Sequence, residues 1–222
     1  MMPARPIKSQ WLKFLPGLLL ALLAFPQGFM ASATAAPTVG PEVAVMNIRV
    51  GKERRNRQII LGLYDSSAPV TTANFKDLAR RRFYRGIRFH RLLPGTLVQT
   101  GDPLTRWWLL AQRTPLRVGT GGPGFTLPPE SRLPLKRGSV AMSRTLSPTN
   151  PGQLSNGSQF FISLAPAPKL NGQFTVFGEV LEGLETLDEI SNLPTDTNDF
   201  PLQNIIIRSI KIVPRLSDSA RP

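Results

Sequence analysis

The sequence predicts a mainly β protein, in which short strands form a closed β-barrel and two helices cover its open ends. Most apolar segments are short, and they alternate with polar residues or are rich in β-branched residues, as strands are. Only two segments, residues 70–81 and 184–190, place apolar side chains at helical spacing. Turns rich in glycine and proline separate many of these segments.

Local sequence signals support each predicted strand and helix along the chain. A basic tip that contains glycine joins the first two strands into a hairpin, and Pro69 lies in the first turn of the first helix. Pro94 and Gly95 separate the next two strands, and residues 119–129 read as a loop. The predicted strands are residues 43–50, 58–64, 87–92, 96–100, 139–143, 159–164, 174–180 and 205–213, and the predicted helices are residues 70–81 and 184–190.

Residues 1–35 have the pattern of a secretory signal peptide. Lys8 and Lys13 form a positive region, residues 15–25 are an apolar run, and residues 31–36 are small. The run is shorter than the roughly 20 apolar residues that span a bilayer comfortably. We therefore expect export to the periplasm or another extracytoplasmic compartment. An uncleaved N-terminal membrane anchor is the alternative reading.

The rest of the chain is long enough for one well-buried domain. We assign residues 36–42 to a linker, residues 43–213 to the domain, and the polar residues 214–222 to a disordered tail. The chain has no cysteine, so disulfides, thiol nucleophiles and cysteine metal sites are excluded.

The single histidine limits the chemistry further. A Ser-His-Asp triad would have to use His90, which lies in an apolar strand pattern. That setting favours a partly buried structural histidine over a general base. No pair of carboxylates stands out for acid–base hydrolysis. We expect no metal and no cofactor.

The charge balance is strongly basic. The net charge of the whole chain is +13, from 27 Lys and Arg against 14 Asp and Glu. Removal of Arg5, Lys8 and Lys13 with the signal peptide leaves 24 against 14, or +10. This balance favours anionic partners, although we interpret the basic runs at 52–57 and 80–82 as a solvated hairpin tip and a helix C-terminus rather than as binding surfaces. Export argues against nucleic acid as a partner.

Four segments carry a family resemblance. Phe-His-Arg-Leu-Leu-Pro-Gly at 89–95 is followed about seventy residues later by Asn-Gly-Ser-Gln-Phe-Phe-Ile at 156–162. Gly-Thr-Gly-Gly at 119–122 and Asn-Gly-Gln-Phe-Thr-Val-Phe-Gly-Glu-Val at 171–180 complete the set. Together they resemble the cyclophilin family of peptidyl-prolyl isomerases over roughly residues 43–213. The resemblance implies an eight-stranded antiparallel barrel capped by two helices.

The resemblance also implies the reaction, which is rotation about an X–Pro peptide bond. The uncatalysed barrier of about 18–20 kcal/mol comes from amide resonance. A fixed cation that donates hydrogen bonds near the prolyl nitrogen favours the twisted amide, and no covalent intermediate is needed. Arg91 matches the catalytic arginine, and Gln99 matches the glutamine that holds the arginine and the substrate backbone.

The substrate-binding positions follow from the same match. Phe161 corresponds to the floor of the proline pocket and Leu170 to an apolar wall. The full set that the resemblance implies is His90, Leu97, Ser143, Arg144, Gln159, Phe161, Lys169, Leu170 and Phe174.

The chain departs from the family pattern at four places. Thr96 stands where an aromatic residue lines the pocket, and Phe174, at a position where histidine is common, is expected to refill that space. Lys169 replaces a tryptophan that contacts cyclosporin in many members. Ser143 and Arg144 replace an Ala-Asn pair that bonds the substrate backbone.

Residues 103–118 are longer than the corresponding segment of typical cyclophilins and contain Trp107 and Trp108. One reading is a loop whose aromatic side chains fold onto the barrel. The other is an accessory contact for a substrate, a partner or a membrane surface, because tryptophan beside arginine suits interfaces.

The expected partners are unfolded or flexible polypeptides that contain proline, and we expect a monomer. Two alternatives stay open. One is a cyclophilin-like binding module or holdase with little catalysis. The other is a basic surface protein that contacts anionic membranes weakly through Trp107, Trp108 and its arginines.

Overall fold

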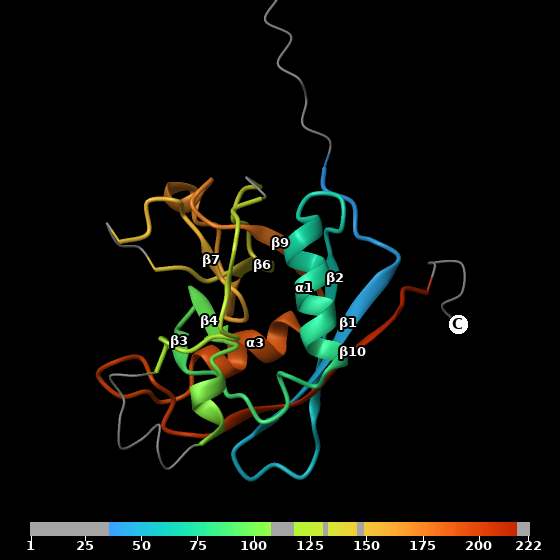
Figure 1. Ribbon diagram of the computed structural model, residues 1–222. Coiled ribbons are helices and arrows are strands. Elements are labelled where there is room, and N and C mark those ends of the chain that lie inside the picture. The colour runs from blue at the N-terminus through green and yellow to red at the C-terminus, as the bar shows by residue number, and fades with distance from the viewer. Residues whose placement is uncertain (1–35, 108–117, 131–132, 146–148, 217–222) are drawn as a thin grey trace, which may run out of the picture. The chain divides into compact units, whose positions relative to one another are not determined.

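The computed structural model describes residues 36–107, 118–130, 133–145 and 149–216 (Figure 1). The larger strands are β1 (Glu42–Val50), β2 (Arg57–Leu63), β3 (Arg91–Leu93), β4 (Leu97–Thr100), β6 (Ser139–Met142), β8 (Phe160–Ser163), β9 (Val176–Glu182) and β10 (Ile205–Pro214). The α-helices of the described chain are α1 (Pro69–Arg80) and α3 (Leu184–Ser191). Each agrees with a predicted element to within a few residues.

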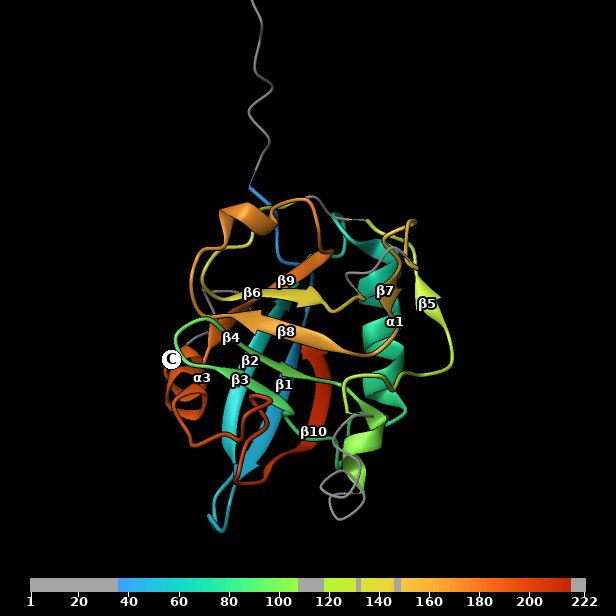
Figure 2. The same ribbon diagram turned by 90° about the vertical axis from the view of Figure 1, so that its left-hand side faces the viewer.

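The eight larger strands form one antiparallel sheet in the order β10-β1-β2-β9-β6-β8-β4-β3. Figure 2 shows β6, β8, β4 and β3 side by side. The prediction missed a separate two-stranded sheet of β5 (Thr126–Leu127) and β7 (Ser155–Asn156), part of which falls in the predicted loop. It also missed two short 3₁₀ helices, η1 (Pro103–Arg106) and η3 (Pro168–Leu170).

The prediction of a closed barrel was wrong, because the sheet curls into a half-barrel whose edges are β10 and β3. One isolated bridge pairs Arg88, in the segment before β3, with Ile206 of β10. Near it, the Phe89 amide donates to the Ile205 carbonyl at 3.0 Å. Beyond that point the chain before β10 is a turn, and the Leu92 amide donates to the Asp199 carbonyl at 2.9 Å. A turn cannot form the regular hydrogen bonds of a strand pair. Strand β3 is therefore shorter than predicted and has no strand partner on the side opposite β4.

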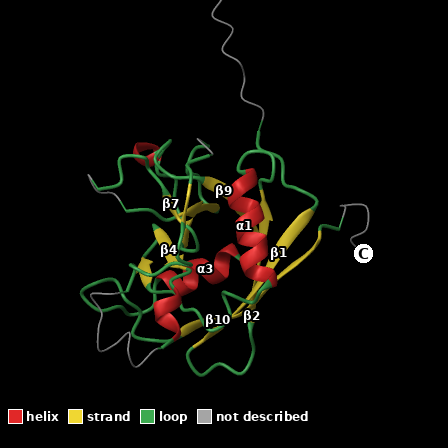
Figure 3. Cartoon of the chain, in the orientation of Figure 1, coloured by secondary structure: helices red, strands yellow, loops and turns green. Residues whose placement is uncertain are grey.

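The main core lies on the concave side of the sheet. Its centre is Phe75 of α1, whose ring lies 5.3 Å from the ring of Tyr84, 5.6 Å from Phe160 and 5.3 Å from Phe177, centroid to centroid. All four side chains are almost fully buried. Helix α1 contacts β10, and α3 contacts β2, β3 and β4 (Figure 3). Phe75, Leu78 and Ala79 of α1 are buried and lie at the spacing of one helix face.

Helix α1 begins at Pro69 without a capping side chain from Ala68. The carboxylate of Glu130 supplies the cap instead, since it accepts hydrogen bonds from the amides of Val70 at 2.8 Å and Thr71 at 2.7 Å. A carboxylate at this end also interacts favourably with the helix dipole. The loop that carries Glu130 is therefore tied to the first turn of the helix.

The ends of the domain follow the prediction only in part. Of the linker residues, Val39 packs on an apolar cluster and the Gly40 amide donates to Leu63 at 2.8 Å, so this part lies along the domain. The signal peptide assigned to residues 1–35 and most of the tail, residues 217–222, lie outside the described residues. Among the described residues, no helix has both the length and the hydropathy to cross a membrane.

We predict that Phe75→Ala lowers the free energy of unfolding by about 3–5 kcal/mol, because it leaves a cavity among three aromatic rings. Urea unfolding followed by circular dichroism measures this. Val70→Ala on the same helix is the matched control, since Val70 is 48% exposed. The control should change the free energy by less than about 0.5 kcal/mol. Equal effects of the two substitutions would contradict the assigned core.

Candidate functional site

The candidate site begins as a row of side chains that crosses four strands. Arg91 of β3 pairs with Gln99 of β4, Gln99 pairs with Phe161 of β8, and Phe161 pairs with Ala141 of β6. Directly opposite residues in an antiparallel sheet project from the same face. The neighbours Leu92, Val98 and Ile162 point into the main core instead, so the row lies on the outer face.

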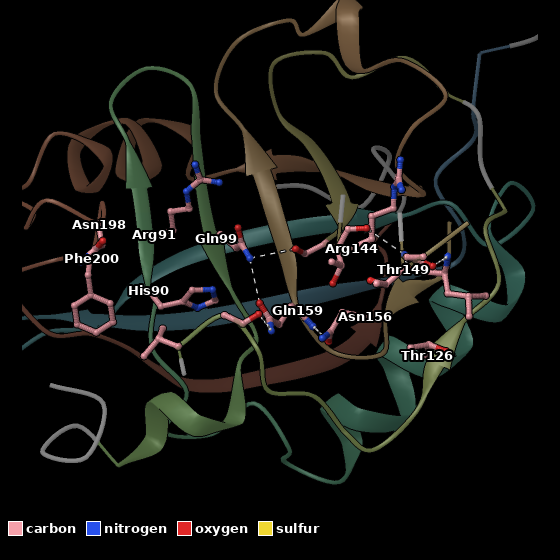
Figure 4. Close-up of a pocket in the computed structure, with 16 residues that line it drawn as sticks. His90, Arg91, Gln99, Thr126, Arg144, Thr149, Asn156, Gln159, Asn198 and Phe200 are labelled. Atoms are coloured by element: carbon pink, nitrogen blue, oxygen red, sulfur yellow. Dashed lines mark hydrogen bonds between the residues drawn. The ribbon is translucent and has the colours of Figure 1, made fainter. Parts of the chain in front are cut away.

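A pocket of about 720 Å³ lies over one end of this row (Figure 4). It gathers six of the predicted site residues: His90, Arg91, Gln99, Ser143, Arg144 and Gln159. It also includes residues outside the predicted site set, notably Asn156 beside Gln159 and the pair Asn198 and Phe200 from the turn before β10. Only tertiary structure brings that turn to the pocket.

Hydrogen bonds connect the polar side chains of the pocket. The Gln99 side-chain amide donates to the Ser143 hydroxyl at 3.2 Å and to Oε1 of Gln159 at 3.1 Å. The Gln159 amide donates in turn to the carbonyls of Gly119 at 2.9 Å and Gly121 at 2.7 Å. Gln99 is therefore fixed through its nitrogen, and its oxygen is oriented as an acceptor.

Asp102 anchors the glycine loop and was not among the predicted site residues. Its carboxylate is fully buried and accepts hydrogen bonds from the amides of Leu104 at 2.8 Å, Gly119 at 2.6 Å and Gly121 at 3.3 Å. A Cβ at Gly121 would overlap this carboxylate, so the position requires glycine. The one available signal was an aspartate directly before Pro103, which is typical of a helix N-cap.

Arg91 presents a half-exposed guanidinium, since 45% of its side chain is accessible. Its Nε donates to the Asp199 carboxylate at 3.2 Å. The terminal nitrogens of Arg91 make no hydrogen bond to the described residues, and Arg91 lines the pocket. Asp199 has a φ of 62° and belongs to a turn held by the Asp196 carboxylate. The sequence did not indicate Asp199.

His90 is buried beside Arg91, with 5% of its surface exposed. Within the described chain neither ring nitrogen has a hydrogen-bond partner. Burial is the main cause that lowers the pKa of His90 to about 4; Asp102 opposes the shift, and the charge of Arg91 contributes to it. The ring is therefore neutral near pH 7, which agrees with a structural histidine that lines the pocket wall. Among the described residues, no three His, Asp or Glu side chains form a metal site.

The apolar positions lie next to the pocket in a second cluster. Its buried members are Tyr64, Leu135, Ala141, Phe161 and Val176. The predicted residues Leu97, Leu170 and Phe174 pack against it and are partly exposed. The ring of Phe174 meets the ring of Phe161 edge-on at 5.1 Å. Because Phe161 is the strand partner of Gln99, this apolar patch adjoins the polar pocket.

The two predicted rim cations differ in how firmly they are held. The Arg144 guanidinium lies 5.4 Å from the ring centre of Phe174, and its Nε donates to the carbonyl of Gln173. Lys169 lies on η3 and is exposed. Arg144 thus covers the edge of the apolar patch, in part as a stacking group.

The start of the long insertion is described. Residues 103–106 form η1, and Arg106 lies 5.0 Å from the ring centre of Phe83. Trp107 is 70% exposed, so the reading that it folds onto the barrel was wrong. Trp108 lies outside the described residues.

Comparison with known proteins agrees with this geometry. Residues 45–212 match the family model described as cyclophilin type peptidyl-prolyl cis-trans isomerase/CLD. The chain is 38% identical over 156 residues to peptidyl-prolyl cis-trans isomerase-like 1 of Emericella nidulans, which covers 68% of this chain and 86% of that protein. It is 38% identical over 161 residues to peptidyl-prolyl cis-trans isomerase-like 3 of Gallus gallus, which covers 69% and 89%.

Solved structures show the same similarity. A cyclophilin type peptidyl-prolyl cis-trans isomerase of Cryptosporidium parvum superimposes with a TM-score of 0.61 at 29% identity, covering 78% of this chain and 99% of that one. The same protein in the presence of the dipeptide Ala-Pro gives a TM-score of 0.59 at 29% identity, covering 77% and 99%. With the family model matched over most of the chain, this protein belongs to the cyclophilin-type peptidyl-prolyl cis-trans isomerase family.

Proposed function

We propose that this protein is an exported prolyl isomerase. It turns X–Pro bonds in unfolded or flexible polypeptides in the periplasm or another extracytoplasmic compartment, assists their folding, and acts as a monomer. The observation that carries the proposal is the row of Arg91, Gln99 and Phe161, in which Arg91 and Gln99 line the polar pocket and Phe161 belongs to the adjoining apolar patch. The use of the Ala-Pro dipeptide with the Cryptosporidium protein supports a proline peptide as ligand.

The mechanism follows from the groups on the two sides of Arg91. Phe161, Leu97 and Leu170 present an apolar surface that grips the prolyl ring. Gln99 holds the substrate backbone through its oriented oxygen. The Arg91 fork donates to the prolyl nitrogen as that nitrogen becomes pyramidal, so the charge stabilises the twisted amide more than the planar one. A reduction of the barrier by about 7 kcal/mol accelerates rotation about 10⁵-fold.

The alternative is a cyclophilin-like binding module or holdase with little catalysis. Two features favour it. Thr96 stands at a position where an aromatic residue lines the pocket in the family, and the Asp199 carboxylate already accepts a hydrogen bond from Nε of Arg91. A protease-coupled isomerisation assay on a proline tetrapeptide separates the readings. A holdase would bind the peptide without raising its isomerisation rate.

A weak membrane contact is a second candidate, and exposed Trp107 beside Arg106 is the feature that favours it. Co-sedimentation with anionic vesicles at low and high salt tests this contact against a Trp107→Ala variant. Equal vesicle binding by the wild type and the Trp107→Ala variant would contradict a membrane contact through Trp107.

We predict that Arg91→Ala retains the circular dichroism of the wild type and loses about 10²–10³-fold in kcat/KM, as expected for one lost transition-state donor. Arg91→Lys should recover little, because the ammonium lacks the planar fork. Arg55→Ala, at the exposed hairpin tip, is the control and should keep full activity. A folded Arg91→Ala protein with normal turnover would refute the catalytic assignment.

We predict a pH dependence that comes from His90. The folded pKa of about 4 lies below the ordinary value of 6.5, so the unfolded state binds the proton more tightly. The free energy of unfolding should therefore decrease as pH falls from about 6.5 to about 4, by up to a few kcal/mol. His90→Gln should remove this contribution, as urea titrations at several pH values would measure. Parallel profiles for both proteins would contradict it.

We predict that the exported protein begins at Ala36 or Pro37, after the small residues that follow the apolar run. N-terminal sequencing of protein recovered from the extracytoplasmic fraction measures this. A membrane-bound product that still begins at Met1 or Met2 would indicate an anchor instead.

A further inference from the structure

A second groove lies away from the candidate site, between the end of α1 and the strand β10. Its volume is about 640 Å³. The segment 79–85, at and after the C-terminus of α1, forms one wall, and residues 208–213 of β10 form the other, with Asn56 at one end. None of these residues belongs to the pocket that holds Arg91.

The strand wall of this groove is an open sheet edge. Strand β10 is outermost in the sheet, and its contacts with the segment before β3 stop at Ile207. Neighbouring side chains of a strand point to opposite faces, so a groove that touches six consecutive residues runs along the backbone edge. No described segment pairs with the outer edge of residues 208–213. At about 3.3 Å per residue, this edge is about 20 Å long.

The groove is lined by cations that lack carboxylate partners. Arg82, Arg85, Arg208 and Lys211 are exposed, and none of them forms an ion pair with the described residues. Arg80 is the exception, because it pairs with Glu42 at 2.7 Å. No Asp or Glu lines the groove. Its field is therefore positive along its length.

Edge protection alone explains part of this pattern. The register of β10 shifts between the pairs that flank Arg208, and Lys211 and Pro214 follow, all of which are devices that discourage pairing between edges. The protection is selective, however. A second copy of this chain, with a net charge of +13, is repelled, whereas an acidic strand is attracted. The cations therefore disfavour a basic partner strand at this edge and favour an acidic one.

We infer that this groove binds an extended acidic segment of a polypeptide, which adds to the edge of β10 as a further strand. Backbone hydrogen bonds along the edge supply a sequence-independent contribution. Glutamate and aspartate side chains pair with Arg82, Arg85, Arg208 and Lys211. Apolar side chains of the added strand contact Ile212 and Val213, which line the groove and are partly exposed.

The strand edge favours a polypeptide over other polyanions. Nucleic acid and lipid headgroups can meet the positive charge, but neither carries the alternating amide donors and carbonyl acceptors that match a β edge. The groove also contains the partly exposed apolar side chains of Ile212 and Val213. An acidic peptide with alternating apolar residues satisfies all three features.

The experiment measures fluorescence anisotropy of a labelled peptide of about eight residues that alternates Glu with Val and lacks proline, so that it avoids the isomerase site. We expect saturable binding that weakens with salt. A peptide that alternates Lys with Val should not bind. A Glu-Val peptide N-methylated at alternate residues keeps its charges and loses its donors, so it should bind at least about tenfold more weakly.

Charge reversal locates the site. Arg208→Glu with Lys211→Glu should weaken binding of the Glu-Val peptide by about tenfold or more. The control is Lys52→Glu with Lys136→Glu, which changes the net charge equally outside the groove and should weaken binding by less than about threefold. Both double variants should keep the isomerase rate of the wild type, so that failure here is distinguishable from failure of the proposed function.

Three outcomes would overturn the inference. Equal losses in the two double variants would show binding to the overall charge. Equal affinity of the N-methylated and the unmodified Glu-Val peptide would show that backbone hydrogen bonds to the edge of β10 do not contribute to binding. Tighter binding of a DNA oligonucleotide or of phosphatidylglycerol vesicles, lost with Arg208→Glu and Lys211→Glu while the Glu-Val peptide does not bind, would assign the groove to another polyanion.

Discussion

The antiparallel register of β3, β4 and β8 is the constraint on which the candidate site depends. It places Arg91, Gln99 and Phe161 in one row and turns their neighbours into the core. A slip by one residue would bury the arginine and expose Leu92 or Val98. Burial of an unpaired guanidinium and loss of apolar contacts would both be costly, so the folding energy of the core also fixes the geometry of the site.

A buried carboxylate extends this order to the rim of the pocket. Asp102 satisfies its charge with three backbone amides, two of which belong to the glycine loop. That loop presents its carbonyls to Gln159, and Gln159 positions Gln99. Because a buried charge without partners is strongly unfavourable, the loop, Gln159 and Gln99 form one connected network rather than separate contacts.

The incomplete closure of the sheet connects the site with the second groove. Where β10 begins, the chain forms a turn instead of a strand beside β3, and this turn brings Asp199 to Nε of Arg91. Where β10 continues past Ile207, no described strand pairs with its outer edge. A fully closed ladder would have removed both features. Because the sheet is not closed, Asp199 contacts Arg91 at one end of β10, and a basic strand edge stays unpaired at the other end.

The sequence by itself predicted the main elements and six of the residues that line the candidate pocket. Period-two patterns and turn residues located the larger strands, and the local motifs around Arg91 and Phe161 identified the family, because such signals lie within a few neighbouring residues. Tertiary structure alone decided the half-barrel, the Asp199 contact, the role of Asp102 and the exposure of Trp107. Each of these joins or separates segments far apart in the chain, so its energy depends on packing and burial that no local pattern encodes.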